Sequence, residues 1–595
     1  MTSTHRQILL LFLPFGVITA VLAGPNFTEC KQKMLESGDE YHWRKAVVGL
    51  IGSQSSFNQA LLYTTEGCLK VCGPGYELYP WPKIAETVTT WVLPSIGLLL
   101  QAPYESNSSA WTNIMLTIRW LGSPIASLTC TLWNISVTGK CALLADMSTP
   151  STRSDKFLQL TGSTSSTFSQ IRDSFYLLSV LNQYTFTSTP NLEYLLRFSL
   201  FDPSPQTVTL RTRLATTLRR QRRRGVVQVM ITLFWFVVVL IISIHRAFGS
   251  LGENATAHDL ALGLLLGWFP TLLATTVVDR NPMDPAHTRR KLNLFLETVQ
   301  RNYPDKFRGK EIQTEVFGTF SGQGRQRWHY GAAHCILNNL EDRHLRAAGR
   351  DWHQLYTNGT IANDTDSMNL HWFDIREFNT AAFSALLLIT SCTGAFCISF
   401  YTPTVGLGCR SGGYMIFCLL TLFSMAVELA SWPFIGRMVT ACPKTINRFL
   451  IALEAMSTGW LMYIIVAQTF GIYNTCECRS SLWGHGGGYM DFESVEFYKQ
   501  LGVERSWMVG AIIGMLSIGA GMGYVTEQWL TQSWLWTAEY ERALEGLEIT
   551  RRWKWVTMPF RYSGRFVIHL MRMAQVWRRD RGYGSVEGRS VRWVA

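Results

Sequence analysis

Long apolar runs separated by polar segments dominate the pattern of this chain. The runs lie at residues 84–102, 112–134, 226–247, 258–278, 380–401, 411–432, 448–472 and 507–528. A helix needs about 20 apolar residues to cross a hydrocarbon layer roughly 30 Å thick. The last six runs meet this requirement most convincingly. The pattern therefore predicts an all-α fold, a polytopic bundle of transmembrane helices.

The first two runs contain residues that interrupt a helix. The run at 84–102 contains Pro94, and the run at 112–134 contains Arg119 and the tripeptide Gly122-Ser123-Pro124. Proline removes a backbone donor, and glycine and serine are weak helix formers. We interpret 84–102 as the first span and 112–134 as a re-entrant or interfacial helix.

Basic residues decide the number of spans. The run Arg219-Arg220-Gln221-Arg222-Arg223-Arg224 lies directly before the span at 226–247. Basic loops tend to stay on the cytosolic side of a membrane. A single crossing at 84–102 puts this run and the later basic loops there. The prediction is seven spans, with the N-terminus outside and the C-terminus in the cytosol. Nine spans also satisfy the rule if 112–134 and the weaker run 174–190 both cross.

Residues 1–23 have the pattern of a secretory signal peptide. His5 and Arg6 precede an apolar core that ends at Val21-Leu22-Ala23. Such a segment is removed on export and takes no part in the fold. We expect an integral protein of the secretory pathway, with the plasma membrane favoured. An uncleaved anchor is the alternative, and both put residue 24 onward outside the cytosol.

The predicted organisation follows the chain in order. After the signal peptide come an exterior cysteine-containing segment at 24–83, the first span at 84–102, a basic inner region at 103–225, two spans within 226–278, a cytosolic loop at 279–379, four spans within 380–528 and a basic cytosolic tail at 529–595. An exterior segment of this length buries little core, so disulfide bonds would help to stabilise it.

Composition supports the membrane class. The 595 residues include 22 Trp, only 16% are charged, and the formal net charge is +12. A mean hydropathy of +0.08 indicates that long polar segments dilute the spans. Because the basic residues lie next to apolar runs, we expect them to orient the chain and to attract anionic inner-leaflet lipid. Nucleic acid is not expected as a partner.

Two strings resemble a known set of proteins. They are GCLKVCGPGYELYPWPKIAETVTTWVLPSIGLLLQAPYESN, which begins at Gly67, and RWLGSPIASL at 119–128. Together they resemble uncharacterised multi-pass integral membrane proteins of filamentous fungi. The resemblance covers about residues 66–134, and the later spans are similar in pattern only. It implies the class of protein, and it implies no reaction or ligand.

Six cysteines fall outside the cytosol in this topology. They are Cys30, Cys68, Cys72, Cys409, Cys476 and Cys478. An even number in an oxidising compartment indicates disulfide bonds. We expect Cys68 to pair with Cys72 or one of the two to pair with Cys30, and Cys409 to pair with Cys476 or Cys478. The spacings are not those of zinc sites, so we predict no metal. Asn26-Phe27-Thr28 is a glycosylation acceptor.

Charged residues inside apolar runs are the remaining candidates for chemistry. Glu428 and Glu454 lie in the inner halves of adjacent predicted spans, where a carboxylate costs about a few kcal/mol unless it is protonated or paired. An ion pair with Arg437 or Arg448, or a hydrogen bond to a neighbouring helix, is favoured over a proton or cation site. Arg119 would extend toward water if its helix is interfacial.

No motif predicts an enzyme. Residues 484–488, GHGGG, resemble an oxyanion loop, but the chain has no G-x-S-x-G nucleophile elbow, no P-loop and no HExxH motif. We therefore predict no catalytic residues and no cofactor. A receptor-like or scaffolding membrane protein with a cytosolic protein partner is favoured. A secondary transporter or channel that uses Glu428 and Glu454 is the alternative, and a membrane-embedded enzyme is least favoured.

Overall fold

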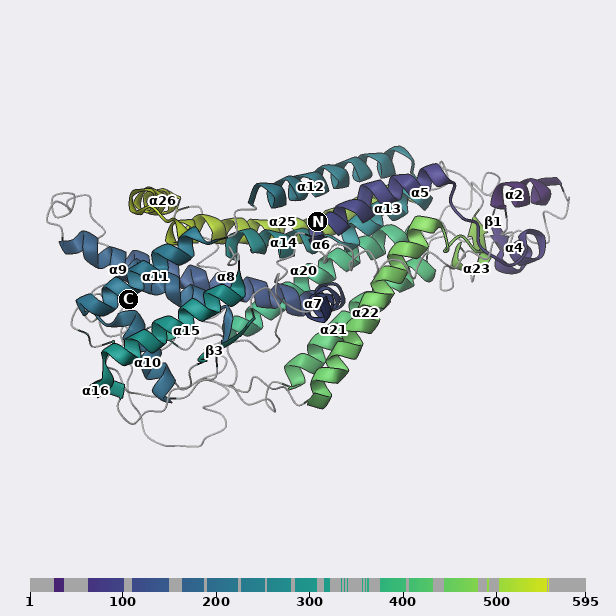
Figure 1. Ribbon diagram of the computed structural model, residues 1–595. Helices are drawn as coiled ribbons and strands as arrows, with labels where there is room; N and C mark the ends of the chain where they lie inside the picture. Colours follow the sequence, from purple (N-terminus) through teal and green to yellow (C-terminus); the bar gives the residue numbers. More distant parts are fainter. Residues whose placement is uncertain are drawn as a thin grey trace, which may run out of the picture.

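The computed structural model describes most of the chain. The described residues are 26–36, 62–100, 110–148, 163–186, 190–222, 226–251, 254–279, 284–307, 315–321, 333, 336–337, 340, 356, 359, 361–362, 375–402, 406–431, 444–479, 489–491, 502–553 and 555. They form an elongated, mostly helical body with a small cysteine-rich cap at one end and a second helical unit at the other (Figure 1). The predicted signal peptide and the tail beyond residue 555 lie outside the described residues.

The cap joins segments that lie far apart in the sequence. It consists of helices α2 (Phe27–Glu36), α4 (Thr65–Cys72) and α23 (Cys476–Arg479) and of the antiparallel strand pair β1 (Leu62–Thr64) and β4 (Tyr489–Asp491). Its small hydrophobic cluster is formed around Phe27, Cys68 and Cys476. We call these elements the cap.

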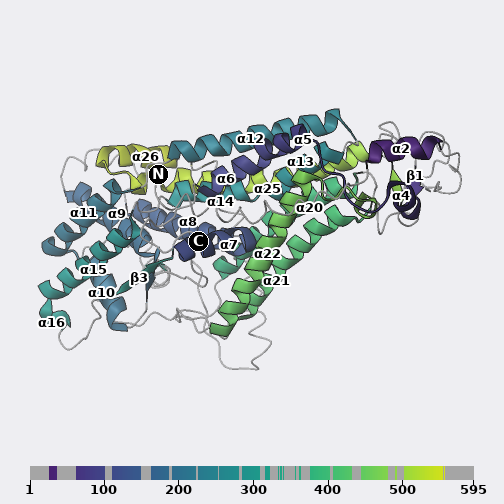
Figure 2. The same cartoon turned by 45° about the vertical axis from the view of Figure 1, so that its right-hand side comes forward.

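The middle of the molecule is a bundle of long apolar helices. Within the described part of the chain, six helical segments are long and apolar enough to cross a membrane. They are α12 (Val226–Gly249), α13 (Asn254–Leu265) with α14 (Phe269–Asp279), α20 (Ile375–Phe400), α21 (Cys409–Ser431), α22 (Lys444–Phe470) and α25 (Val503–Gln532). Helices α21 and α22 diverge together from the other helices in both views (Figures 1 and 2).

The first apolar run is also helical along nearly its whole length. It consists of α5 (Trp81–Thr87), the π-helical turn η2 (Val88–Val92) and α6 (Leu93–Leu100). The π turn precedes Pro94, where the missing N–H interrupts the usual α-helical ladder. Trp91 in this turn is fully buried, and its ring meets Phe236 of α12 edge to face at 5.5 Å. A side chain at Gly263 of α13 would overlap the Trp91 ring, so this glycine permits the contact.

The run at 112–134 is divided between two helices. Helix α7 (Ala110–Gly122) ends and α8 (Pro124–Met147) begins at Ser123, whose φ and ψ of −132° and 65° are not helical. Proline suits the first position of a helix, because its missing N–H has no partner there. Helix α8 is buried along most of its 24 residues. Its first half packs in the bundle core, and its second half packs in a second core.

That second core belongs to what we call the distal unit, the helical unit opposite the cap. Its elements are α9 (Ser163–Leu181), β2 (Tyr184–Phe186), α10 (Pro190–Phe201), α11 (Pro205–Arg220), α15 (Pro285–Asn302), α16 (Pro304–Phe307), β3 (Phe317–Phe320), the 3-10 turn η7 (Ser533–Trp536) and α26 (Tyr540–Arg552). Strands β2 and β3 pair antiparallel with one register shift. Phe175, Phe198 and Trp534 are among its fully buried side chains.

The outward faces of the bundle are apolar. On α12, Ile231 and Phe234 are exposed by 63% and 69%, and α25 exposes Ile512 and Leu516 in the same way. Large exposed apolar surfaces are unusual on soluble proteins. Together with the lengths of the six segments, these faces indicate a protein embedded in a membrane.

Where the structure describes the polar regions, they form packed helices and short strands and not only loops. Within 103–225 and 279–379, the described residues form packed helices, and two small sheets join the otherwise helical fold. The weak apolar run 174–190 is divided between α9, β2 and α10. Leu177, Leu178 and Leu181 of this run pack in the distal core, so their hydrophobicity serves packing within the protein.

Candidate functional site

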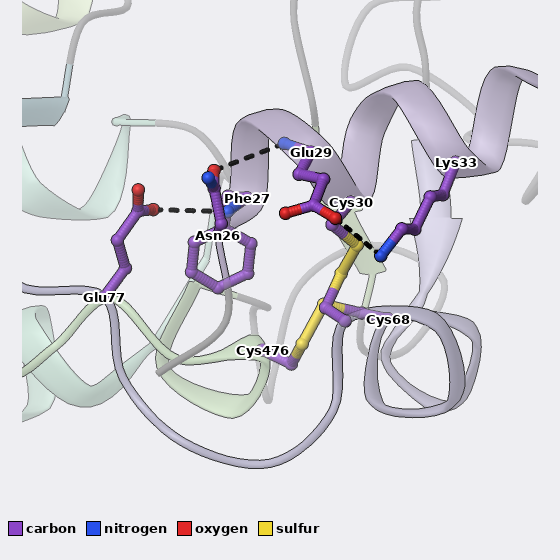
Figure 3. The surroundings of a disulfide bond; sticks show 9 residues. Asn26, Phe27, Glu29, Cys30, Lys33, Cys68, Glu77 and Cys476 are labelled. Atoms are coloured by element: carbon purple, nitrogen blue, oxygen red, sulfur yellow. Dashed lines mark hydrogen bonds and ion pairs between the residues drawn. A yellow bond between two sulfur atoms is a disulfide. The ribbon is translucent and has the colours of Figure 1, made fainter. Parts of the chain in front are cut away.

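Disulfide bonds hold the cap together and fasten it to the bundle. Among the described residues, three bonds join Cys30 to Cys72, Cys68 to Cys476 and Cys409 to Cys478, with Cα–Cα distances of 5.2, 5.8 and 5.0 Å. Figure 3 shows Cys68 bonded to Cys476, with Cys30 of α2 beside them. Since Cys409 begins α21 and Cys476 follows α22, the cap is anchored covalently to two long helices.

The pairing differs in part from the expectation. Cys409 pairs with Cys478, one of the two partners that the sequence allowed, and Cys30 pairs with Cys72. Cys68 does not pair with Cys72, although their sulfurs are 3.7 Å apart. It bonds to Cys476, which is 408 residues away in sequence. Spacing along the chain carries no information about such a distant contact.

Three sulfur atoms in the cap lie at distances that would suit a metal. Those of Cys68, Cys72 and Cys476 are all within 4.8 Å of one another. A metal binds cysteine as the thiolate. Each of these sulfurs is already in a disulfide bond. In this structure the three sulfurs therefore belong to disulfide cross-links.

The glycosylation candidate Asn26 lies at the start of the cap. It is exposed, and its Oδ1 accepts a hydrogen bond of 3.2 Å from the Glu29 N–H, so it caps α2. The Phe27 N–H is directed toward Glu77 Oε2, at 3.4 Å (Figure 3). The capping bond uses the amide oxygen, whereas a glycan would be attached to the amide nitrogen.

Residues 73–80, which we call the strap, connect the cap to α5 and lie on the end of α22. The Glu77 N–H donates to the Asn474 carbonyl at 3.0 Å, and the Tyr79 N–H donates to the Phe470 carbonyl at 3.1 Å. Gly471 adopts a φ of +81° at this point. A side chain there would meet the strap backbone at 3.0 Å. Glycine therefore permits both the turn and the close approach.

Beneath this strap, Arg410 is buried in the first turn of α21. It is 7% exposed. Its Nη1 donates to Asn254 Oδ1 at 3.0 Å, and its Nη2 donates to Asn474 Oδ1 at 3.1 Å. Both acceptors are neutral amides, and no described carboxylate forms an ion pair with this guanidinium. The positive charge therefore lacks an anionic partner among the residues that the structure describes.

Four polar atoms at this place, one of them on Arg410 itself, lack hydrogen-bond partners within the described ranges. They are Arg410 Nε, both ring nitrogens of His258 and the hydroxyl of Tyr79. His258 is 3% exposed, and both His258 and Tyr79 interact electrostatically with Arg410. A buried polar group without a partner costs about 1–3 kcal/mol. We call Arg410, Asn254, Asn474, His258 and Tyr79 the Arg410 site.

The two carboxylates that the sequence predicts within spans lie on helices that contact each other. Glu454 on α22 is 3% exposed, and Glu428 on α21 is half-buried. Glu454 lies where α22 packs against the break between α7 and α8. A Cβ atom at Gly122 would overlap the Glu454 carbonyl oxygen, and Thr458 Oγ1 donates to the Ile118 carbonyl at 2.9 Å.

Arg119 is more enclosed than an interfacial residue would be. It lies on α7, four residues before the break at Ser123, and is 7% exposed. Its carbonyl oxygen accepts hydrogen bonds from the Ser123 N–H at 2.9 Å and from Ser127 Oγ at 3.3 Å. The residue therefore helps to hold the start of α8, and its side chain is buried rather than extended into water.

A second buried cationic cluster lies where the bundle joins the distal unit. Arg219 Nη1 and Asp173 Oδ1 form a buried ion pair of 2.5 Å. The guanidinium groups of Arg219 and Arg222 lie 4.4 and 5.1 Å from the centre of the Tyr176 ring, and Arg222 also lies 3.8 Å from that of Trp536. These contacts join α9, α11 and η7 just before α12 begins. Two arginines of the basic run thus have a structural role.

Arg172 belongs to the same cluster. It donates to the carbonyl oxygens of Trp534 and Thr537. Burial, followed by the neighbouring charge of Arg219, lowers the pKa of Arg172 to about 9. The direction follows from desolvation of a cation and from repulsion between like charges.

No protein-family model, curated protein or solved structure matches this chain. Any functional argument therefore depends on the geometry of the chain itself.

Arg410 and His258 are not among the residues that the sequence singled out. One feature of the sequence could have pointed to Arg410. It follows Cys409 at the cap end of a span, where the positive-inside tendency disfavours a basic residue. Its burial could not be read from the sequence, since its acceptors come from α13 and from the turn after α22.

Proposed function

We propose that this protein is a receptor-like or scaffolding membrane protein that joins an exterior cap to a cytosolic helical unit. The observation that carries the proposal is the sharing of helices between two cores. Leu128 of α8 and Val525 of α25 pack in the bundle core, whereas Ala145 of α8 and Trp534, just after α25, pack in the distal core. Continuous helices through both cores would transmit a change at the cap or present the distal unit at a fixed position.

The charge and cysteine distributions support the proposed orientation. The three disulfide bonds among the described residues lie toward the cap, and disulfides persist in oxidising compartments. Arg219, Arg220 and Arg222 of the basic run lie at the opposite end, before α12. We infer seven spans, the helix from Trp81 to Leu100 being the first, with the cap exterior and the C-terminus cytosolic. A plasma-membrane protein of the secretory pathway with a glycan on Asn26 fits this orientation.

The exposed face of α11 offers a surface for a cytosolic partner. A hollow of about 690 Å³ is lined there by Val208, Thr209, Thr212, Arg213, Thr216, Thr217, Arg220 and Gln221. Its hydroxyl and guanidinium groups suit an acidic protein segment. Because α11 leads directly into α12, the same basic surface would also face anionic inner-leaflet lipid.

Co-purification after crosslinking in native membranes tests the scaffolding proposal. The full chain should retain a stoichiometric cytosolic protein, and the double variant Arg213→Glu/Arg220→Glu should bind it at least about tenfold more weakly, because both cations are reversed. The matched control is Arg301→Glu, an exposed charge on α15, and it should retain the partner. Absence of a stoichiometric partner, or equal retention by both variants, would remove this proposal.

A secondary transporter or channel is the second candidate, and one observation favours it. Broken helices with nearby buried carboxylates are typical of transport sites. Here Glu454 is buried, and its backbone carbonyl lies against Gly122, next to the break at Ser123. Flux or growth assays on Glu454→Gln and Glu428→Gln test this candidate. Wild-type behaviour of both variants would eliminate it.

A further inference from the structure

We propose that the Arg410 site binds a small carboxylate ligand that enters from the cap end of the bundle. The inference goes beyond the proposed function, because it needs no cytosolic partner. It starts from a buried guanidinium that has two neutral amide acceptors and no described ion pair. A buried charge without a counter-ion is costly, and an anion would relieve that cost.

The backbone around Arg410 also favours an anion. Helix α21 begins at Cys409, one residue before Arg410, and α13 begins at Asn254, whose side chain contacts the guanidinium. Helix N-termini carry partial positive charge and attract anions, while a basic residue there is unfavourable. Two such ends beside one buried arginine raise the local potential. Their combined effect stabilises a bound anion and destabilises the ligand-free protein.

The donors that remain fit a carboxylate. Arginine has five N–H groups in a planar fork. The Nη1 and Nη2 atoms each make one bond to an amide oxygen, and Nε makes none among the described residues. The edge formed by Nε and one Nη nitrogen is suited to bidentate carboxylate binding. The Tyr79 hydroxyl and a ring nitrogen of His258 provide further donors, since neither has a partner in the described chain.

The strap makes the site sensitive to the cap. Tyr79 belongs to the strap, and Asn474 both accepts from Arg410 and donates through Nδ2 to the Glu77 carbonyl at 3.2 Å. A ligand held by Arg410 and Tyr79 would therefore bridge the strap to α21. Asp259, the next residue along α13 after His258, accepts from Thr87 Oγ1 at 2.8 Å. The Asp259 carboxylate therefore forms a hydrogen bond with α5.

The test uses the purified full chain in nanodiscs and acetate as the probe. Thermal unfolding is followed by tryptophan fluorescence in sodium acetate and in sodium chloride of equal concentration. Binding is measured separately from the ¹⁹F relaxation of trifluoroacetate and its displacement by acetate. Acetate should raise the unfolding temperature of the wild type more than chloride does, because a ligand of the native state alone stabilises it.

Three variants locate the effect. Tyr79→Phe removes one hydroxyl and should weaken acetate binding about tenfold, as expected for a hydrogen bond to a charged group. Arg410→Gln should abolish the acetate response. Arg246→Gln is the matched control, because Arg246 is an exposed arginine on α12 that pairs with Glu86, and it should bind as the wild type does. If Arg410→Gln does not fold, Tyr79→Phe and the ¹⁹F measurement still show whether a carboxylate binds at this site.

Two results would overturn the proposal. One is an equal response of the wild type to acetate and chloride together with no displaceable trifluoroacetate. The other is displacement by inorganic phosphate but not by acetate, which would show an anion site of a different geometry. Neither result bears on whether a cytosolic partner binds the α11 face, so the two proposals fail separately.

Discussion

Gly122 has no side chain, and this allows α7 and α22 to pack closely together. A Cβ atom there would overlap the Glu454 carbonyl oxygen of α22. We expect Gly122→Ala to lower the free energy of unfolding by about 1–3 kcal/mol, because overpacking forces the helices apart. Gly459→Ala on α22 is the control, since among the described residues no atom outside its own stretch of helix lies within 4 Å of the position that its methyl group would take. Thermal unfolding in nanodiscs measures both, and equal stability of the two variants would contradict the packing argument.

Replacing Arg219 should destabilise the protein because it removes one charge of a buried ion pair. Its ion pair with Asp173 is buried, with both side chains 3% exposed. Arg219→Gln should lower the free energy of unfolding by about 3–5 kcal/mol, because it leaves the Asp173 carboxylate buried without its partner. Arg213→Gln, an exposed position on the same helix, should have little effect. Adding Asp173→Asn to Arg219→Gln should recover part of the loss in denaturant unfolding. A double variant less stable than Arg219→Gln alone would contradict this account.

Among the elements, the cap makes the sharpest prediction, because its disulfide pattern can be mapped. Lys70 lies between Cys68 and Cys72, and Glu477 lies between Cys476 and Cys478. Trypsin together with a glutamate-specific protease therefore separates all four cysteines. Mass spectrometry without reduction should find Cys30 linked to Cys72, Cys68 to Cys476 and Cys409 to Cys478. A peptide pair linking Cys68 to Cys72 would contradict the structure, and reduction before digestion is the control.

The elements also separate what the sequence could predict from what it could not. The helices at 226–247 and 507–528 were predictable, because a long and mostly apolar run is a local property of the sequence. The distal unit was not, since Phe198 and Leu218 are buried only through contacts with other helices of that unit. The same reasoning applies to the Arg410 site. Its residues come from α13, α21, the strap and the turn after α22, and no local pattern reports their convergence.

At the scale of the whole molecule, the shared helices predict that the bundle and the distal unit are coupled in unfolding. Phe175 is fully buried in the distal core, and its ring meets that of Phe201 at 5.8 Å. Phe175→Ala should cost about 3–5 kcal/mol through the cavity that it leaves. Because α8 and α25 with η7 belong to both cores, amide hydrogen exchange should accelerate along α9 and also in the last turns of α25.

Hydrogen exchange with mass spectrometry in nanodiscs resolves the two regions. Phe449→Ala is the control, because Phe449 on α22 is 48% exposed and its removal leaves no internal cavity. Faster exchange confined to α9, α10 and α11 would mean that the distal unit opens by itself, and the receptor-like mechanism would lose its rigid connection. Faster exchange that extends into α25 would mean that a change in one core reaches the other, as transmission across the membrane requires.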